Sequence, residues 1–209
     1  YLTNVRTAVA GGICAELLAP KKIDSIGVIG AGVQARMQVK YLSNIVECRK
    51  VKVWGRSGES VEKYIKDMAS ENWEVKRVIK TDEIAESCDI IITTTPSKTP
   101  LLKKDNLKKG TLIIAVGSDS PGKQELDEKI LQDADYIVAD SIVQCIDRGE
   151  ISHGIKNKII NQEEIAELGN LIDSKIDVSC GDNQIIVADL TGVAVQDIQI
   201  AKAVFKACE

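Results

Sequence analysis

Several features that mark particular classes of protein are missing from this sequence. No apolar run approaches the roughly 18 to 20 residues of a membrane-spanning helix, so we expect no membrane partner. The net charge of −4 leaves no broad basic face, which argues against nucleic acid as a partner. The single histidine, His153, cannot form a metal site by itself. We interpret it as a solvated loop residue beside Gly154, and we expect no metal.

Closely spaced cysteine pairs are also lacking, although the chain has six cysteines. No two of them form a C-x-x-C pair, and several lie within apolar segments. This pattern favours buried, reduced thiols over a zinc site or a set of disulfides. Residues 1–20 lack the cationic start and the cleavage pattern of a signal peptide. We therefore expect a soluble, cytoplasmic protein.

The most informative feature that is present is a glycine-rich turn within residues 26–35, IGVIGAGVQA. Gly30 and Gly32, with Ala35 in the third position, follow the G-x-G-x-x-A pattern between a short apolar strand and a helix start. In this pattern the glycines allow a tight turn and a close backbone approach to a pyrophosphate, at a helix N-terminus that favours anions. We therefore predict a dinucleotide site that includes Val33 and Gln34, the alternative being a purely structural glycine turn.

Strand and helix patterns alternate along most of the chain, which predicts an α/β protein with a doubly wound parallel sheet of the Rossmann type. Residues 2–18 are expected to form a helix with Thr3 or Asn4 as its N-cap. The alternation that follows predicts strands over 26–29, 51–54, 75–79, 90–93, 112–116 and 136–139, with helices over 34–42, 60–71, 81–86 and 123–131. Ligands of such sheets bind at the carboxyl ends of the strands, so we expect the chemistry in the loops that follow them.

The pattern changes after residue 140. Helices are expected over 141–148, over 161–172 and from 191 to the end of the chain, and residues 184–188, QIIVA, are compatible with one more strand. We therefore predict a dinucleotide-binding domain over residues 21–139. Residues 1–20 and 140–209 would form part of a second unit.

The choice of cofactor can be predicted from the end of the second expected strand. Enzymes that use NAD typically carry an acidic residue there for the ribose hydroxyls. This sequence has Arg56 and Ser57 after Gly55 instead, and a guanidinium beside a hydroxyl suits a 2′-phosphate. We therefore favour NADP(H), with NAD(H) as the alternative.

Six segments in order resemble the ornithine cyclodeaminase and mu-crystallin family of NAD(P)-dependent enzymes, which act on amino or imino acids. They are LTNVRTAVA, VIGAGVQA, TTTPSKTP, VGSDSPGKQELD, RGEISHG and DLTGVAVQD. The resemblance implies that the second unit is part of a substrate and dimerisation domain, and that the protein is a homodimer. Members usually carry a further segment before LTNVRTAVA, with strands of that domain and a substrate-binding lysine. Its absence here is expected of a fragment or of a shortened relative.

The resemblance also implies roles for three charged residues. Arg6 lies in the segment that meets the substrate carboxylate, which suits the planar fork of a guanidinium. Asp119 matches the acidic catalytic position, and Lys123 resembles a lysine near the cofactor. From the residues alone, the alternatives are an exposed helix arginine, a turn-forming aspartate and an exposed lysine at a helix start.

Two further segments are implied to line the nicotinamide side of the cofactor. Residues 93–97, with Thr93 and Thr95, would lie beside the ribose and phosphates, and 115–117 along the ring. The latter segment consists of Ala115, Val116 and Gly117. Both are otherwise ordinary strand ends. Many relatives have serine where Leu190 stands, so a side-chain contact from that position is lost.

Three functions remain open at this point. The first is an oxidoreductase that transfers hydride at the α-carbon of a small amino or imino acid, and Arg56 with Ser57 favours it. The second is a lyase of the ornithine cyclodeaminase type, which uses bound NAD to convert ornithine to proline, and Asp119 favours it. The third is a noncatalytic dinucleotide-binding protein, which the absent N-terminal segment favours.

Overall fold

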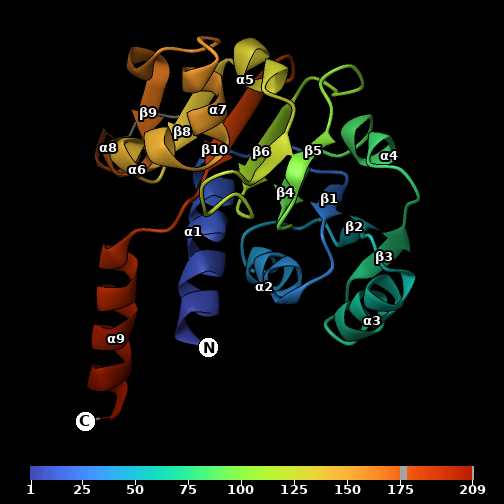
Figure 1. The fold of residues 1–209 in the computed structure, drawn as a ribbon. Coiled ribbons are helices and arrows are strands. Elements are labelled where there is room, and N and C mark those ends of the chain that lie inside the picture. Colours follow the sequence, from blue (N-terminus) through green and yellow to red (C-terminus); the bar gives the residue numbers. More distant parts are fainter. Residues whose placement is uncertain (175–177, 209) are drawn as a thin grey trace.

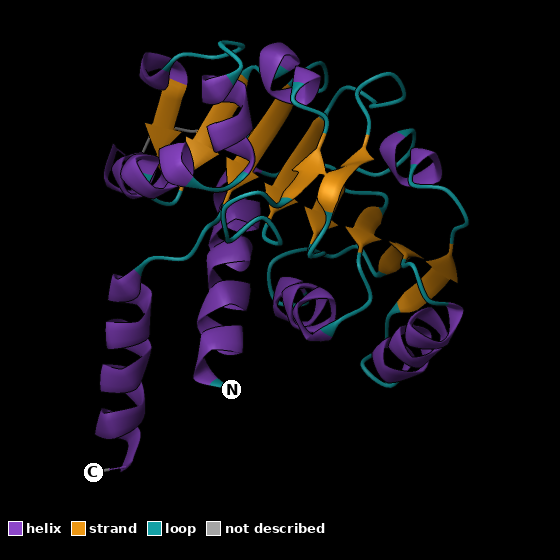
Figure 2. Ribbon diagram, in the orientation of Figure 1, coloured by secondary structure: helices purple, strands orange, loops and turns teal. Residues whose placement is uncertain are grey.

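The computed structural model describes residues 1–174 and 178–208 and shows one large sheet covered by helices on both faces (Figures 1 and 2). The sheet has eight strands in the order β3-β2-β1-β4-β6-β10-β8-β9, and every pairing in it is parallel. Its strands are β1 (Ile26–Ile29), β2 (Lys50–Trp54), β3 (Glu74–Arg77), β4 (Ile90–Thr93), β6 (Thr111–Ala115), β8 (Tyr136–Ala139), β9 (Ile165–Glu167) and β10 (Ile185–Asp189). The predicted fold class, a doubly wound α/β sheet, is confirmed.

The helices form two layers, each with its own apolar core. One face of the sheet is covered by α1 (Leu2–Leu18), α2 (Val33–Leu42) and α3 (Gly58–Ala69). The opposite face is covered by α4 (Asp82–Ala85), α5 (Lys129–Asp133) and α7 (Glu150–Lys156), with α6 (Ile142–Asp147) beside them. Every residue of β1, β4, β6 and β10 is buried, as expected for parallel strands that are covered on both sides.

The start of α1 differs from the prediction, because Tyr1 occupies the N-cap position without a side-chain cap. Asn4 instead accepts a hydrogen bond from Gln34 Nε2 at 3.3 Å, which ties α1 to α2. Further along the same contact, Gly11 lets α2 approach closely, since a Cβ on Gly11 would lie 1.9 Å from the side-chain oxygen of Gln38. The proposed caps, Thr3 and Asn4, were therefore wrong.

Two predicted helices are only partly helical. Within residues 123–131 the chain first forms the short strand β7 (Gln124–Leu126), paired with β5 (Lys98–Leu102) in a two-stranded sheet, and only then α5. Within residues 161–172 a 3₁₀ turn (Gln162–Glu164) leads into the edge strand β9, and α8 (Leu168–Ser174) follows. In both places short extended segments find hydrogen-bond partners far away in the sequence.

The strand considered for residues 184–188 is confirmed as β10, and it lies inside the sheet between β6 and β8. Strands β9 and β10 both follow residue 139, so the sheet continues past the predicted domain boundary, which stays a prediction. His153 lies in α7 rather than in a solvated loop. Its Nε2 is 2.8 Å from the backbone oxygen of Lys123, and the helix was not predicted.

Buried thiols were predicted correctly for four of the six cysteines, and all six are free. Cys48 is partly buried and Cys208 is exposed. The four buried ones are Cys14, Cys88, Cys145 and Cys180.

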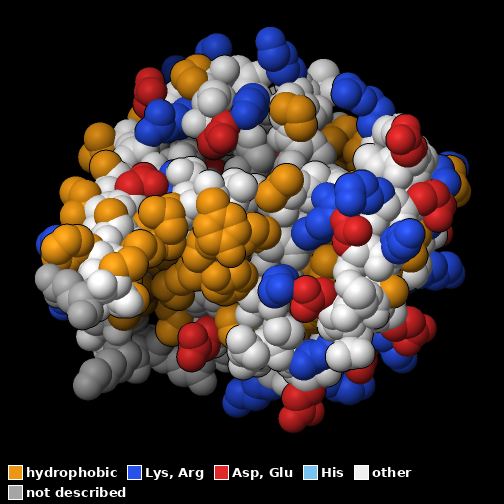
Figure 3. Space-filling view, turned by 90° about the horizontal axis from the view of Figure 1, so that it is seen from below, with side chains coloured by type: hydrophobic (Ala, Val, Ile, Leu, Met, Phe, Trp, Pro, Cys, Tyr) orange, Lys and Arg blue, Asp and Glu red, His pale blue; other side chains and the backbone are white. Residues whose placement is uncertain are grey.

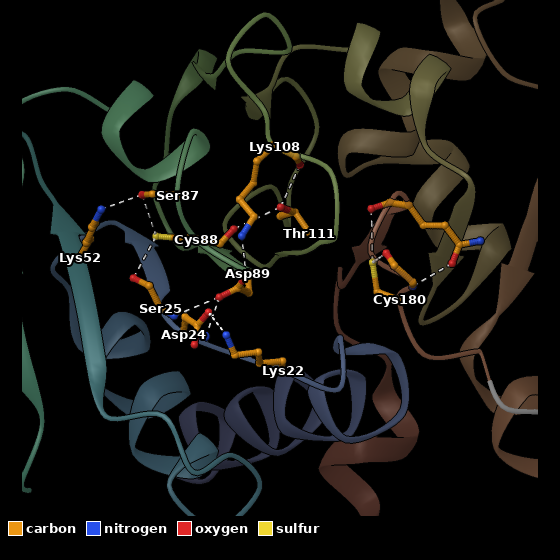
Figure 4. A network of polar contacts seen from close by, with 12 residues as sticks. Lys22, Asp24, Ser25, Lys52, Ser87, Cys88, Asp89, Lys108, Thr111 and Cys180 are labelled. Carbon is orange, nitrogen blue, oxygen red and sulfur yellow. Dashed lines mark hydrogen bonds and ion pairs between the residues drawn. The ribbon is translucent and has the colours of Figure 1, made fainter.

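A polar network joins the amino ends of the central strands, at the edge of the sheet opposite to the carboxyl ends of the strands (Figure 4). Asp89 precedes β4, and its carboxylate accepts hydrogen bonds from the backbone N–H groups of Asp24 and Ser25 at 2.7 and 3.0 Å. Lys108 donates to the other carboxylate oxygen, and Thr111 at the start of β6 donates to the backbone oxygen of Lys108. The network thus joins the starts of β1, β4 and β6.

The last helix, α9 (Ala194–Cys208), lies beside α1 and has no buried residue. A groove runs between α1, α8 and α9, and it is lined mainly by apolar side chains such as Val9, Ile13 and Ile200. Figure 3 shows apolar side chains gathered on the face from which α1 and α9 project. None of the helices in the described parts of the chain is long and apolar enough to cross a membrane.

Candidate functional site

A cleft of about 380 Å³ opens at the carboxyl ends of β1, β2 and β4. Strand β1 has β2 on one side and β4 on the other, so the strand order reverses there. This is the switch point at which ligands bind in doubly wound sheets. Three segments line the cleft, namely residues 30–32 after β1, residues 54–57 at the end of β2 and residues 94–97 after β4.

The glycine turn has the geometry that the sequence pattern predicts. Gly30 has φ +124°, and a Cβ there would lie 2.4 Å from the hydroxyl of Thr94. Gly32 is the N-cap of α2 with no side-chain cap, and a Cβ there would meet nothing within 4 Å. Ala35 is fully buried in the core beneath. The first backbone N–H groups of α2 therefore border open space, which fits an anionic group of a bound ligand.

An arginine that sequence reasoning missed holds this turn in shape. Arg36 donates to the backbone oxygens of Ala31 and Gly32 at 3.0 and 2.9 Å, and to the carboxylate of Asp67 at 2.7 Å. Its position one helical turn after Gly32 is the signal that could have found it. With both carbonyl groups engaged by one guanidinium, the turn is held in a fixed position at the start of α2.

The predicted residues at the helix start differ in their surroundings. Val33 is more than half exposed. The amide nitrogen of Gln34 donates to the backbone and side-chain oxygens of Asn4, both at 3.3 Å, so the side chain is held against α1. Its oxygen is buried with no hydrogen-bond partner.

The cleft has one arginine beside the end of β2, and a second arginine lies nearby at the end of β3. Arg56 and Ser57 line the cleft, and Ser57 caps α3 by accepting a hydrogen bond from the backbone N–H of Ser60. Arg77, at the end of β3, was not predicted. Its guanidinium lies 3.3 Å from the point where a Cβ on Gly58 would stand. Both arginines therefore lie near the start of α3, where Arg56 lines the cleft and Arg77 also forms an ion pair with Glu62 at 3.6 Å.

Asp119 and Lys123 form an ion pair of 2.6 Å in the loop after β6. Burial favours the neutral carboxyl group, but hydrogen bonds from Lys123 and Ser120 and the charge of Lys123 outweigh it and lower the pKa of Asp119. Lys123 lies in the turn before β7, so the expected position at a helix start was wrong. The pair presents an ionised carboxylate on the same edge of the sheet as the cleft.

The predicted nicotinamide-side segments lie at the ends of β4 and β6, and most of their side chains are buried. Thr93, Ala115 and Val116 are buried, whereas Thr95 lines the cleft. Gly117 packs tightly, because a Cβ on it would lie 2.3 Å from the backbone oxygen of Thr95. These ends therefore offer mainly backbone to a ligand.

Arg6 lies outside the cleft, in the groove between α1, α8 and α9. Its guanidinium donates to Asp197 at 3.0 Å and to Gln196 at 3.1 Å, both on α9. Gly192 packs against it with φ +82°, where a Cβ would lie 2.6 Å from Nη1. Of the predicted residues, the cleft brings together Gly30, Gly32, Arg56, Ser57 and Thr95.

The parallel sheet, the glycine turn and the cleft at the switch point define a Rossmann-type α/β protein. Comparison of sequences makes this more specific, because residues 1–209 match the family model of the ornithine cyclodeaminase/mu-crystallin family. The chain belongs to this family, and the predicted membership is confirmed.

Individual relatives agree with this assignment. The chain is 36% identical over 207 residues to an alanine dehydrogenase of Archaeoglobus fulgidus, covering 99% of this chain and 63% of that protein. An archaeal alanine dehydrogenase dimer with bound NAD has a TM-score of 0.92 and 35% identity, covering 98% of this chain and 63% of that one. The Δ1-pyrroline-2-carboxylate reductase of Thermococcus litoralis, with NADH and L-proline, has a TM-score of 0.91 and 28% identity, covering 96% and 63%. The chain thus spans about 63% of the length of these relatives.

Proposed function

We propose that this chain forms the dinucleotide-binding part of an NAD(P)-dependent oxidoreductase that acts at the α-carbon of a small amino or imino acid. The observation that carries the proposal is the cleft at the switch point, where Gly32 leaves open space at the start of α2. The relatives that contain NAD or NADH support it. A nicotinamide dinucleotide bound in the cleft would supply hydride transfer.

The side chains of this chain would bind the substrate and handle its protons. Arg6 offers a charged planar fork that suits a substrate carboxylate, and Gln196 and Asp197 hold that fork in place. Asp119 is ionised at neutral pH because its pKa is lowered, so one of its carboxylate oxygens can accept a proton. Lys123 compensates the negative charge while the carboxylate is ionised.

The test of this proposal is a fluorescence titration of the 209-residue chain with NADH and NADPH, followed by turnover with imino acids. We expect saturable binding of a dinucleotide, with an affinity that falls at least about tenfold in Gly32→Ala. Absence of binding would contradict the proposal.

Within this function we propose NADP(H) as the preferred cofactor. Arg56 and Arg77 lie near the start of α3, where Ser57 adds a hydroxyl group, and no acidic side chain lies among the residues described as lining the cleft. Such a set of donors suits a 2′-phosphate better than ribose hydroxyls. In the same titration, Arg56→Ala should bind NADPH about tenfold more weakly than the wild type, which is the effect of one lost charge-assisted contact. Its affinity for NADH should be nearly unchanged. Lys66→Ala, which removes a cation at the other end of α3, is the matched control.

A cyclodeaminase-type lyase is the second candidate, and the ionised carboxylate of Asp119 favours it. The two candidates differ in net consumption of the cofactor. An oxidoreductase changes the absorbance of the reduced nicotinamide in step with substrate, whereas the lyase regenerates its cofactor and releases ammonia. Ammonia release without a net change in absorbance would replace the first proposal by the second.

We further propose that the protein forms a homodimer, since the archaeal alanine dehydrogenase is described as a dimer. The apolar groove between α1, α8 and α9 supports this. Analytical ultracentrifugation tests it, and a monomer at all concentrations would contradict it.

A further inference from the structure

Three carboxyl groups form a buried chain behind the cleft. Glu125, Glu150 and Asp189 are 0%, 1% and 1% exposed. Among residues 1–174 and 178–208, none of the three forms an ion pair with a lysine or arginine. Burying a carboxyl group without a cation is costly unless hydrogen bonds compensate it. The hydrogen bonds that each carboxyl group accepts therefore indicate which parts of the structure these three residues hold together.

Glu125, on β7, joins the carboxyl ends of two central strands. One carboxylate oxygen accepts from the hydroxyl of Thr93 at 2.7 Å and from the backbone N–H of Gly117 at 2.9 Å. The other accepts from the backbone N–H of Thr95 at 2.5 Å. Thr93 ends β4, Gly117 follows β6, and Thr95 lines the cleft.

Glu150 and Asp189 connect Glu125 to the rest of the sheet through hydrogen bonds to backbone N–H groups. Glu150, at the start of α7, accepts from the backbone N–H groups of Glu125 and Leu126 at 2.8 and 3.1 Å. Asp189, at the end of β10, accepts from the backbone N–H of Ile151 at 2.9 Å. The chain of contacts therefore runs from β10 through α7 and β7 to the floor of the cleft.

The position of Glu125 relates it to one half of a bound dinucleotide. In doubly wound sheets the pyrophosphate lies at the glycine turn and the adenosine ribose at the end of the second strand. Here Gly32 and Arg56 mark those places, so the remaining half extends along the loop that contains Thr95. Glu125 accepts a hydrogen bond from that loop, and among the described residues none of the hydrogen bonds to its carboxyl group comes from β2.

We propose that Glu125 is a positioning residue for the nicotinamide half of the dinucleotide, because it holds the loop after β4 against the loop after β6. Glu150 keeps β7, and with it Glu125, in place. The inference rests on the proposed function. Without the carboxyl group of Glu125, the two loops would be held together only by neighbouring backbone. The loops would then have to become ordered when the dinucleotide binds, which weakens the affinity for it.

The test is to remove the hydrogen bond between Thr93 and Glu125 by changing each partner in turn. Thr93→Val deletes one hydroxyl with little change in shape. Glu125→Gln replaces one acceptor by an N–H₂ group that faces backbone N–H donors. The matched control is Thr111→Val, which deletes a hydroxyl that is equally buried at the amino end of β6.

Each variant is titrated with NADPH or NADH and with ADP, which lacks the nicotinamide half, and its unfolding midpoint is measured. We expect Thr93→Val and Glu125→Gln to bind the dinucleotide about tenfold more weakly, the equivalent of one lost hydrogen bond, with unchanged affinity for ADP. Thr111→Val should lower the unfolding midpoint and leave both affinities unchanged.

Equal weakening of both ligands in Thr93→Val would overturn the inference, because a general structural role would affect both halves. Unchanged affinity for both ligands would also overturn it. If Glu125→Gln does not fold, Thr93→Val still decides between these outcomes. If the wild-type chain binds both ADP and the dinucleotide, but the variants change the affinity for the two ligands equally or not at all, this inference is refuted and the proposed function is not. A wild-type chain that binds neither refutes the proposed function, and this inference with it.

Discussion

The two glycines of the turn after β1 should respond in opposite ways to the same substitution. Gly30 adopts φ +124°, which L-residues rarely adopt, and its missing Cβ would lie 2.4 Å from the hydroxyl and 3.3 Å from the backbone oxygen of Thr94. Gly32 has φ −84°, which any residue adopts, and open space beside it. Gly30→Ala is therefore expected to affect folding, and Gly32→Ala binding.

The expected magnitudes follow from these contacts. Gly30→Ala combines backbone strain with overpacking against the hydroxyl and the backbone oxygen of Thr94, which together cost roughly 2–5 kcal/mol. Gly32→Ala only weakens an N-cap position, at a cost of roughly 0.5–1 kcal/mol. Its methyl group would however enter the space assigned to the pyrophosphate. We expect the affinity for the dinucleotide to fall at least about tenfold, or 1.4 kcal/mol.

The assay compares urea unfolding, followed by circular dichroism, with titration of the folded variants by NADH and NADPH. A Gly30→Ala variant within about 1 kcal/mol of the wild type would show that the turn relaxes freely and that the argument from φ is wrong. A Gly32→Ala variant with wild-type affinity would show that the ligand does not approach the start of α2.

Three further outcomes follow from buried groups elsewhere in the molecule. Asp89→Ala should lower the free energy of unfolding by roughly 2–4 kcal/mol, because it leaves Lys108 and two backbone N–H groups without their acceptor; a loss below about 1 kcal/mol in urea unfolding would contradict this. Burial raises the pKa of Glu150 to about 8, so between its unfolded value near 4.3 and that pH the folded state binds the extra proton and stability should fall as pH rises. The pH profile of unfolding should be flatter in Glu150→Gln, and an equally steep profile would refute the assignment. In the native protein iodoacetamide should modify Cys208, which is exposed, long before Cys14, whose pKa burial raises to about 12; equal rates by mass spectrometry would contradict the buried placement.

The parts of the fold that could be predicted are those specified by local sequence. The four residues of β1 and of β4 are apolar or small, and the glycine turn has strict conformational needs, so both could be read from short segments. The three residues of β7 are too few to show a period. They are extended because they pair with β5 and because Glu150, 24 and 25 residues away, accepts hydrogen bonds from the N–H groups of Leu126 and Glu125. No local pattern contains that information.

The candidate site shows the same division. The glycines and Arg56 were predicted because their roles follow from position relative to a strand. Arg77 and Glu125 were missed because each acts across strands, Arg77 beside Gly58 and Glu125 between the ends of β4 and β6. Arg6 was predicted as a ligand for a carboxylate, but its contact with α9 spans 191 residues of sequence and could not be foreseen.

The position of β10 has a consequence for the order in which the protein folds. This strand comes near the end of the chain, yet it lies between β6 and β8. During synthesis β1, β2, β3, β4 and β6 can pair as soon as they emerge, whereas β8 and β9 can pair only with each other and cannot join the other strands until residues 185–189 arrive. The apolar residues of β8 therefore stay exposed until β10 has been synthesised. We expect the nascent chain to be most prone to aggregation during this interval.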